Sequence, residues 1–273
     1  MIDGSKGFHE IPKVDLSLTR ISASAEQTIK HLDAIIEKTR GGAPVRKARR
    51  VGSTYKLSRD PKGGEPDERS REACIERAIF RKWGPVTRIS CKDSAFLPSV
   101  CQFIQTYQMP LQDKRADAAW GKIDLVGVSF EWLPVVIELK EEKSVETPLR
   151  MLVEATGYAV AVSKAWKDGC LREEWCKSIE RVMAASAPKF EWPDKLQTVP
   201  IICAAPRAYW KQRRGKAGAE PNALPKEAWK ALADLMSALN DEGFPVTLVE
   251  FDAKKGVGDE PMIDQVASFA PPV

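Results

Sequence analysis

Three charged residues interrupt two apolar, strand-like segments near the middle of the chain. Asp124 stands within Lys-Ile-Asp-Leu-Val-Gly-Val, and Glu138 and Lys140 flank Leu139 at the end of Pro-Val-Val-Ile-Glu-Leu-Lys. Burying a charge is costly unless it is paired or bound to an ion. Because strand side chains alternate between faces, Glu138 and Lys140 share one face. The short connection between the segments predicts a hairpin, which lets Asp124 approach that same face.

Two carboxylates on one face repel each other unless a cation lies between them. Mg²⁺ or Mn²⁺ fits such a site, since each takes carboxylate, carbonyl and water oxygens. Lys140 would lie beside a water on the metal, where it can orient or deprotonate that water and offset developing negative charge. This combination predicts metal-assisted phosphodiester hydrolysis. A solvated strand end is the alternative, because Glu141-Glu142-Lys143 follows at once.

The composition excludes several other kinds of chemistry. The chain of 273 residues has two histidines, His9 and His31, and six cysteines without a Cys-x-x-Cys pair. This scarcity argues against His-based nucleophilic catalysis and against a zinc site. No run approaches the roughly 18 apolar residues of a membrane span, and the N-terminus lacks the apolar core of a signal peptide. We therefore expect no membrane partner and a cytoplasmic location.

Hydrophobic periodicity predicts the elements that must position these residues. Helices are expected at 24–40, 70–83, 147–166, 169–187 and 225–243, and strands at 100–111, 122–130, 133–140, 198–206 and 245–252. This order predicts a mixed sheet flanked by helices, an α/β sandwich. Residues 41–68 are rich in glycine, proline and charge and predict a linker. The expected organisation is a helical segment with a basic linker at 1–68 and one domain at 69–273.

Two basic patches suit a polyanionic partner. Residues 38–59 contain eight basic and no acidic residues, and residues 207–216 contain five basic and no acidic residues. Such patches attract a phosphate backbone, and the Tyr209-Trp210 pair could stack on a base. A solvated, flexible basic loop is the competing interpretation. The candidate nucleic-acid contacts in these patches are Arg49, Arg50, Lys211, Arg213 and Arg214.

The hairpin sequence resembles the PD-(D/E)xK nuclease superfamily, which includes many restriction endonucleases, RecB-type nuclease domains and junction resolvases. The motif residues are Gly-Lys-Ile-Asp-Leu-Val-Gly at 121–127 and Val-Val-Ile-Glu-Leu-Lys at 135–140. The resemblance implies an α-β-β-β-α-β, restriction-endonuclease-like core, which is similar to the order predicted over 70–206. An N-terminal helical extension and a C-terminal helix–strand addition would flank this core, and 69–273 would form the nuclease domain.

The resemblance also implies a role for each hairpin residue. Asp124 and Glu138 would be metal ligands, the Leu139 carbonyl a further ligand, and Lys140 the catalytic lysine. The expected cofactor is Mg²⁺, or Mn²⁺ in its place.

Many members of the superfamily place a metal-binding glutamate on the first core helix. Glu72 and Glu76 lie four residues apart and therefore on one helical face. Glu76 stands deeper in the apolar segment, so we favour it as the catalytic, metal-binding glutamate. A surface carboxylate paired with Arg77 or Arg81 is the alternative.

The RecB-like branch often has a glutamine four residues before a tyrosine on the helix that follows the lysine strand. Here Tyr158 is present, Glu154 replaces the glutamine, and Arg150 lies one turn earlier. The three share a face directed towards the hairpin. Tyr158 and Arg150 are candidate nucleic-acid contacts, with Arg150 on the scissile phosphate. A salt bridge between Arg150 and Glu154 is the competing interpretation.

The resemblance implies a divalent-metal-dependent deoxyribonuclease that acts in defence, including antiviral defence, or in repair. The partner would be DNA, with RNA less favoured, and the N-terminal helical segment suggests a homodimer or a complex with a regulatory partner. Three alternatives remain open. They are a non-catalytic nucleic-acid-binding or assembly protein that retains the fold, an RNase of the same fold, and an unrelated α/β protein in which Glu-Leu-Lys is coincidental.

Overall fold

The structure is a computed structural model. It describes residues 71–85, 95–110, 122–167, 169–183, 191–215, 222–254, 256 and 261–272. The predicted N-terminal segment at 1–68, with the first basic patch and its Arg49 and Arg50, lies outside the described residues.

Six strands form one mixed sheet in the order β1-β2-β3-β4-β5-β6. Neighbours are antiparallel from β1 to β3, parallel from β3 to β5, and antiparallel again between β5 and β6. The bounds are β1 Phe103–Pro110, β2 Lys122–Val128, β3 Pro134–Leu139, β4 Ile201–Pro206, β5 Val246–Lys254 and β6 Met262–Phe269. The antiparallel β2–β3 pair confirms the predicted hairpin, and the helices around this sheet confirm the α/β class.

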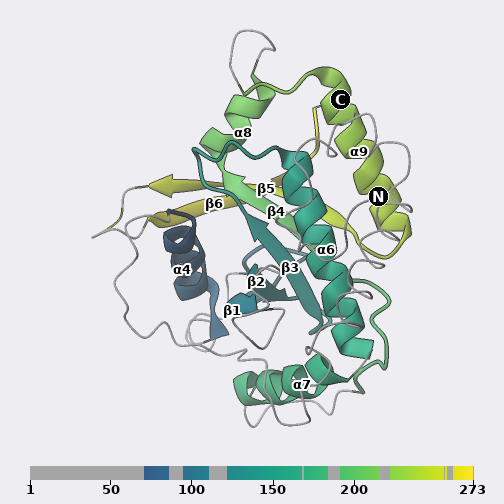
Figure 1. Ribbon diagram of the computed structural model, residues 1–273. Coiled ribbons are helices and arrows are strands. Elements are labelled where there is room, and N and C mark those ends of the chain that lie inside the picture. The colour runs from purple at the N-terminus through teal and green to yellow at the C-terminus, as the bar shows by residue number, and fades with distance from the viewer. Residues whose placement is uncertain are drawn as a thin grey trace.

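Five helices accompany the strands in the described residues. They are α4 Arg71–Trp83, α6 Pro148–Lys167, α7 Cys170–Met183, α8 Arg207–Arg214 and α9 Lys226–Asp241. In Figure 1, α4 (dark blue) and α6 (teal) lie on either side of β3. None of these helices combines the length and the apolarity that a bilayer span requires.

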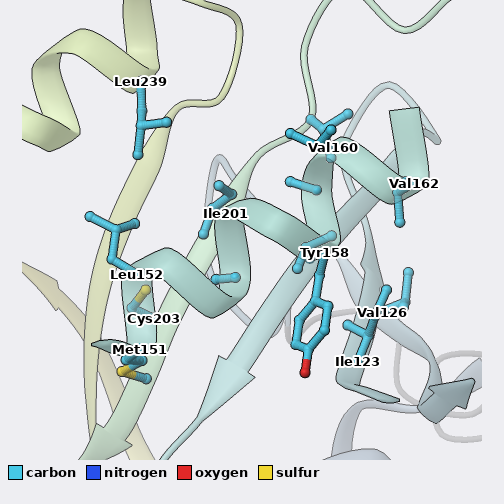
Figure 2. Packing of buried hydrophobic residues seen from close by; sticks show 14 of the residues in the cluster. Ile123, Val126, Met151, Leu152, Tyr158, Val160, Val162, Ile201, Cys203 and Leu239 are labelled. Carbon is cyan, nitrogen blue, oxygen red and sulfur yellow. The ribbon is translucent and has the colours of Figure 1, made fainter. Parts of the chain in front are cut away.

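Alternation along the central strands supplies two hydrophobic cores. Val136 and Cys203 pack in the core that contains α6, whereas Ile137 and Ile202 pack in the core that contains α4. β3 and β4 are buried along their whole lengths because both faces are covered. Figure 2 shows Tyr158 directed from α6 towards β2.

The sequence explains the position and the polarity of α6. Thr147 precedes the helix and its Oγ1 accepts a hydrogen bond from the Arg150 amide at 3.2 Å, while Pro148 occupies the first turn. The helix is buried over almost its whole length, from Pro148 to Val162. Arg150 and Glu154 are the charged residues in its first three turns. Burial of those two charges therefore has to be compensated by partners.

Two elements differ from the predicted ones. The basic segment at 207–216 contains the helix α8, and β6 lies in the tail beyond the strand predicted to be the last. β6 is at the edge of the described sheet and its buried hydrophobic residue is Ile263, so it lacks the apolar run of a central strand. The C-terminal addition thus comprises two helices, α8 and α9, and two strands, β5 and β6, instead of one helix and one strand.

Candidate functional site

A cavity of about 450 Å³ opens where β2 begins, β3 ends and α6 begins. Its walls come from α4, the two strands, α6 and the loop that joins β3 to α6. The lining residues are Glu72, Asp124, Glu138, Lys140, Glu141, Lys143, Ser144, Val145, Glu146, Glu154 and Tyr158. Carboxylates outnumber ammonium groups in this lining, so the cavity attracts cations.

The backbone pairing of β2 and β3 ends at the cavity. The β2–β3 pairing runs from Val128 opposite Pro134 to Leu125 opposite Ile137. Beyond that point the Leu139 amide donates a hydrogen bond to Asp124 Oδ2 at 2.8 Å, so a side chain takes the place of the backbone acceptor. This bond holds the Asp124 carboxylate beside the last residue of β3, as the hairpin predicted.

Lys140 is the buried cation of the cavity. Its side chain is 7% exposed, and Nζ lies 2.8 Å from Glu138, 3.0 Å from Glu146 and 3.3 Å from Glu154. Burial alone would lower the pKa of this ammonium, but the surrounding carboxylates, Glu138 and Glu154 foremost, outweigh it and raise the pKa well above its ordinary value. Lys140 therefore keeps its proton and acts here as a charge and a hydrogen-bond donor.

The two hairpin carboxyls lie where the charged form is disfavoured. Burial raises the pKa of Asp124 well above its ordinary value, with Glu76 and Glu72 adding to the effect. Burial also raises the pKa of Glu138, with Asp124 adding to it. Glu138 Oε1 accepts from Lys140, while its Oε2 is buried and has no hydrogen-bond partner among the described residues. Such an oxygen favours a further positive charge, either a proton or a metal cation.

Both glutamates of α4 reach Asp124. One carboxylate oxygen from each of Glu72, Glu76 and Asp124 lies within 4.8 Å of the others, a spacing that could hold a metal ion. Glu76 is 3% exposed, which excludes the alternative of a surface carboxylate. Glu72 is partly buried, lines the cavity and belongs to the same group, although the sequence favoured Glu76 alone. The four-residue spacing of Glu72 and Glu76 had indicated that both side chains lie on one face of the helix.

Two residues of α6, Glu154 and Tyr158, line the cavity, and Arg150 is paired with the first of them. Arg150 Nη2 and Nε lie 2.6 Å and 2.7 Å from Glu154 Oε1, so the competing salt-bridge interpretation is the one observed. Tyr158 lines the cavity but is 3% exposed, and its burial, followed by the charges of Glu138 and Asp124, raises its pKa. Glu154 thus contacts both Arg150 and Lys140. The replacement of the glutamine by glutamate at this position did not predict the contact with Lys140.

The second basic patch requires a correction, because it is a helix with a buried face. Tyr209, Trp210 and Arg213 are buried, and the Trp210 indole N–H donates to the Val249 carbonyl at 2.8 Å. The two rings are therefore not available to stack on a base. Arg213 is 2% exposed, so it is not a surface contact for a phosphate backbone.

The solvent face of α8 differs from its buried face. Lys211 and Arg214 are exposed and, with Arg207 and Glu250, line a second cavity of about 560 Å³. Arg214 is paired with Glu250, which also lies 3.3 Å from Arg207. Part of the positive charge of this patch is thus neutralised within the fold.

Sequence reasoning missed Glu146. It belongs to residues 141–147, the loop between β3 and α6 that we call the strap. Its side chain is 36% exposed, and its carboxylate lies 3.0 Å from Lys140 Nζ in the lining of the cavity. No periodicity marks a residue in irregular backbone, so the printed sequence carries no signal for this contact.

Comparison with known proteins adds no assignment for this site. No family model, no curated protein and no solved structure matches the chain. The chemistry of the cavity therefore follows from its own residues.

Proposed function

We propose that the protein is a divalent-metal-dependent nuclease that hydrolyses phosphodiester bonds of DNA, with a PD-(D/E)xK, restriction-endonuclease-like core. The observation that carries this proposal is that Asp124, Glu138 and Lys140 line one cavity at the end of the β2–β3 hairpin. The order of α4, the three antiparallel strands, α6 and the parallel strand β4 supports it, since it is similar to the α-β-β-β-α-β core.

The residues present fit a hard cation. Its ligands would be Asp124, Glu138 and the Leu139 carbonyl, with Glu72 or Glu76 from α4. All are oxygen donors, which Mg²⁺ and Mn²⁺ prefer, and Glu138 contributes a buried oxygen without a hydrogen-bond partner in the described residues. When bound, the cation would supply a Lewis-acid charge to a phosphoryl oxygen and make a water molecule more acidic.

Lys140 would act through its charge. The buried carboxylates of Glu138 and Glu154 hold its ammonium in the protonated state and in a fixed place. From that place it can donate a hydrogen bond to a phosphate oxygen or to the attacking water, and offset the negative charge that develops in the transition state.

DNA is the proposed substrate because RNases of the same fold typically use other catalytic residues, whereas Asp-Glu-x-Lys is intact here. Lys211 and Arg214, on the solvent face of α8, would contact the phosphate backbone. Such contacts are salt-sensitive and carry no sequence information.

Incubation of the purified protein with supercoiled DNA, linear DNA and RNA, with Mg²⁺, Mn²⁺ or EDTA, tests the proposal. We expect metal-dependent cleavage of DNA that EDTA abolishes. Asp124→Asn should remove cleavage because it removes a ligand charge while leaving an oxygen to accept the Leu139 amide. Asp252→Asn, on β5 beside Arg207, is the matched control and should cleave like the wild type.

Two results would redirect the proposal. Retention of DNA without cleavage under any of these metals would favour the non-catalytic nucleic-acid-binding protein. Cleavage of RNA in place of DNA would favour the RNase of the same fold.

A further inference from the structure

The strap and α8 are distant in sequence but in contact in the fold. The Arg213 guanidinium donates through Nη2 to the Ser144 carbonyl and, at 3.3 Å, to the Glu146 carbonyl. The Tyr209 hydroxyl donates to the same Glu146 carbonyl at 2.9 Å. Two side chains of α8 thus hold the backbone of the strap at two carbonyls, those of Ser144 and Glu146.

Arg213 is buried inside the protein and does not lie on its surface. Its guanidinium carbon lies 4.0 Å from the centre of the Tyr209 ring, a cation–π arrangement, and Nη1 lies 3.1 Å from Gln212. A buried guanidinium is costly unless its donors find acceptors. The strap carbonyls are two of these acceptors, so burial of Arg213 requires the strap in its observed place.

The strap in turn determines the surroundings of Lys140. An ammonium has three N–H donors, and three carboxylates, those of Glu138, Glu146 and Glu154, lie within reach of it. Glu138 and Glu154 come from a strand and a helix, whereas Glu146 comes from irregular backbone. The third partner of Lys140 is therefore fixed only if the strap is fixed.

We infer that Arg213 is a positioning residue of the cavity: with Tyr209 it anchors the strap and so places Glu146 against Lys140. As a contribution to catalysis this inference rests on the proposed nuclease function, but the anchoring can be measured without it. The buried part of the basic segment at 207–216 would then serve the orientation of the catalytic lysine rather than contact with a polyanion.

Hydrogen exchange of the strap amides tests the anchoring directly. Arg213→Gln should speed exchange over residues 141–147 by about tenfold, the factor that corresponds to loss of roughly one hydrogen bond. Arg214→Gln is the matched control, because it makes the same change on the neighbouring arginine, which bonds Glu250 instead of the strap. Unchanged strap exchange in Arg213→Gln, or equal acceleration in both variants, would overturn the inference.

Steady-state cleavage of DNA separates positioning from general loosening of the fold. Arg213→Gln and Glu146→Gln should each lower kcat by about tenfold with little change in KM, since a misplaced Lys140 weakens only the transition state. The kcat of the double variant should be no lower than that of either single variant, because both substitutions disrupt the same contact between the strap and Lys140. Arg214→Gln should instead raise KM. Additive losses in the double variant, or a rise in KM for Arg213→Gln, would contradict the assignment.

Tyr209→Phe keeps the inference testable if Arg213→Gln fails to fold. It deletes one hydroxyl that bonds Glu146 and leaves the ring that stacks on Arg213. We expect faster strap exchange and a lower kcat, both by a smaller factor, and unchanged exchange would overturn the anchoring. Absence of cleavage by the wild type would refute the nuclease proposal alone, since the exchange measurement still decides whether α8 anchors the strap.

Discussion

The hairpin end and α8 both carry charged residues next to apolar ones, yet the fold uses them in opposite ways. At the hairpin, Glu138 and Lys140 are buried and directed into a cavity that contains further charges. On α8, Arg213 is also buried, but its guanidinium bonds backbone carbonyls, while Lys211 and Arg214 face solvent. The two regions therefore differ in the partners of their buried charges: other charged side chains at the hairpin end, and backbone carbonyls at α8.

The periodicity of each element determines which of its charges are buried. At the end of β3 the two-residue period places Glu138 and Lys140, the residue after the strand, on one face. In α8 the spacings of three and four residues place Arg213 on the same face as Trp210 and Tyr209, and Trp210 packs edge-on against Phe269 at 4.9 Å between ring centres.

Trp210→Ala should have the largest effect, and on stability rather than on binding. Trp210 is fully buried and its N–H is bonded to Val249, so truncation leaves a cavity and an unpaired carbonyl. We expect a loss of about 3–5 kcal/mol in the free energy of unfolding, measured by urea denaturation. Lys211→Ala, the exposed neighbour, should cost within about 0.5 kcal/mol. A stable Trp210→Ala protein with weakened DNA binding would restore the interpretation that this ring stacks on bases.

Lys140→Ala should come next, with an effect on chemistry rather than on binding. Removing a group that stabilises transition-state charge typically lowers kcat by about 10²–10³-fold. DNA affinity measured in Ca²⁺ should stay close to that of the wild type. Lys230→Ala on α9, an exposed lysine paired with Asp234, is the control and should leave kcat unchanged. Full activity of Lys140→Ala would remove the assigned role.

The effect of pH on thermal stability should distinguish the hairpin carboxyls from ordinary surface acids. A carboxyl whose pKa is raised in the folded state contributes stability below its unfolded pKa, which is lost as the pH rises through the folded value. For Asp124 this loss begins above its ordinary pKa of 3.8. The Tm of Asp124→Asn relative to the wild type should therefore rise from about pH 4 towards neutrality. Saturating Mn²⁺ should make the wild type the more stable of the two proteins. A difference in Tm that does not change with pH would contradict the raised pKa of Asp124.

The smallest effect is expected on the solvent face of α8. Lys211→Gln should weaken DNA binding a few-fold and reduce the slope of log K against log salt by about 1, as for one lost phosphate contact. Lys230→Gln on α9 is the charge-matched control. An unchanged salt dependence of binding would show that the solvent face of α8 does not contact the phosphate backbone of DNA.

The hairpin site could be predicted from sequence because local rules fix it. Strand alternation and a short connection were sufficient to bring Asp124, Glu138 and Lys140 to one cavity. Helix α8 was not predicted because an arginine on its buried face breaks the apolar period, and β6 because an edge strand buries little beyond Ile263.

The strap lies beyond the reach of such rules. Its Ser144 carbonyl is bonded by Arg213, which lies 69 residues away in the sequence. Only tertiary packing brings these segments together, so neither the position of Glu146 nor the role of Arg213 could be derived from spacing. For Glu154, the pairing with Arg150 followed from the four-residue spacing, but its contact with Lys140, the residue after β3, did not.

Titration of the protein with Mn²⁺, followed by calorimetry and by electron paramagnetic resonance of the free ion, tests the central claim most directly. The wild type should bind Mn²⁺ at the hairpin end, and Glu138→Gln should weaken that binding by at least about tenfold, within the range for loss of a metal-site partner. Glu142→Gln, an exposed residue outside the cavity lining, should bind like the wild type. Equal Mn²⁺ binding by the wild type and Glu138→Gln would contradict a metal centre built on these carboxylates.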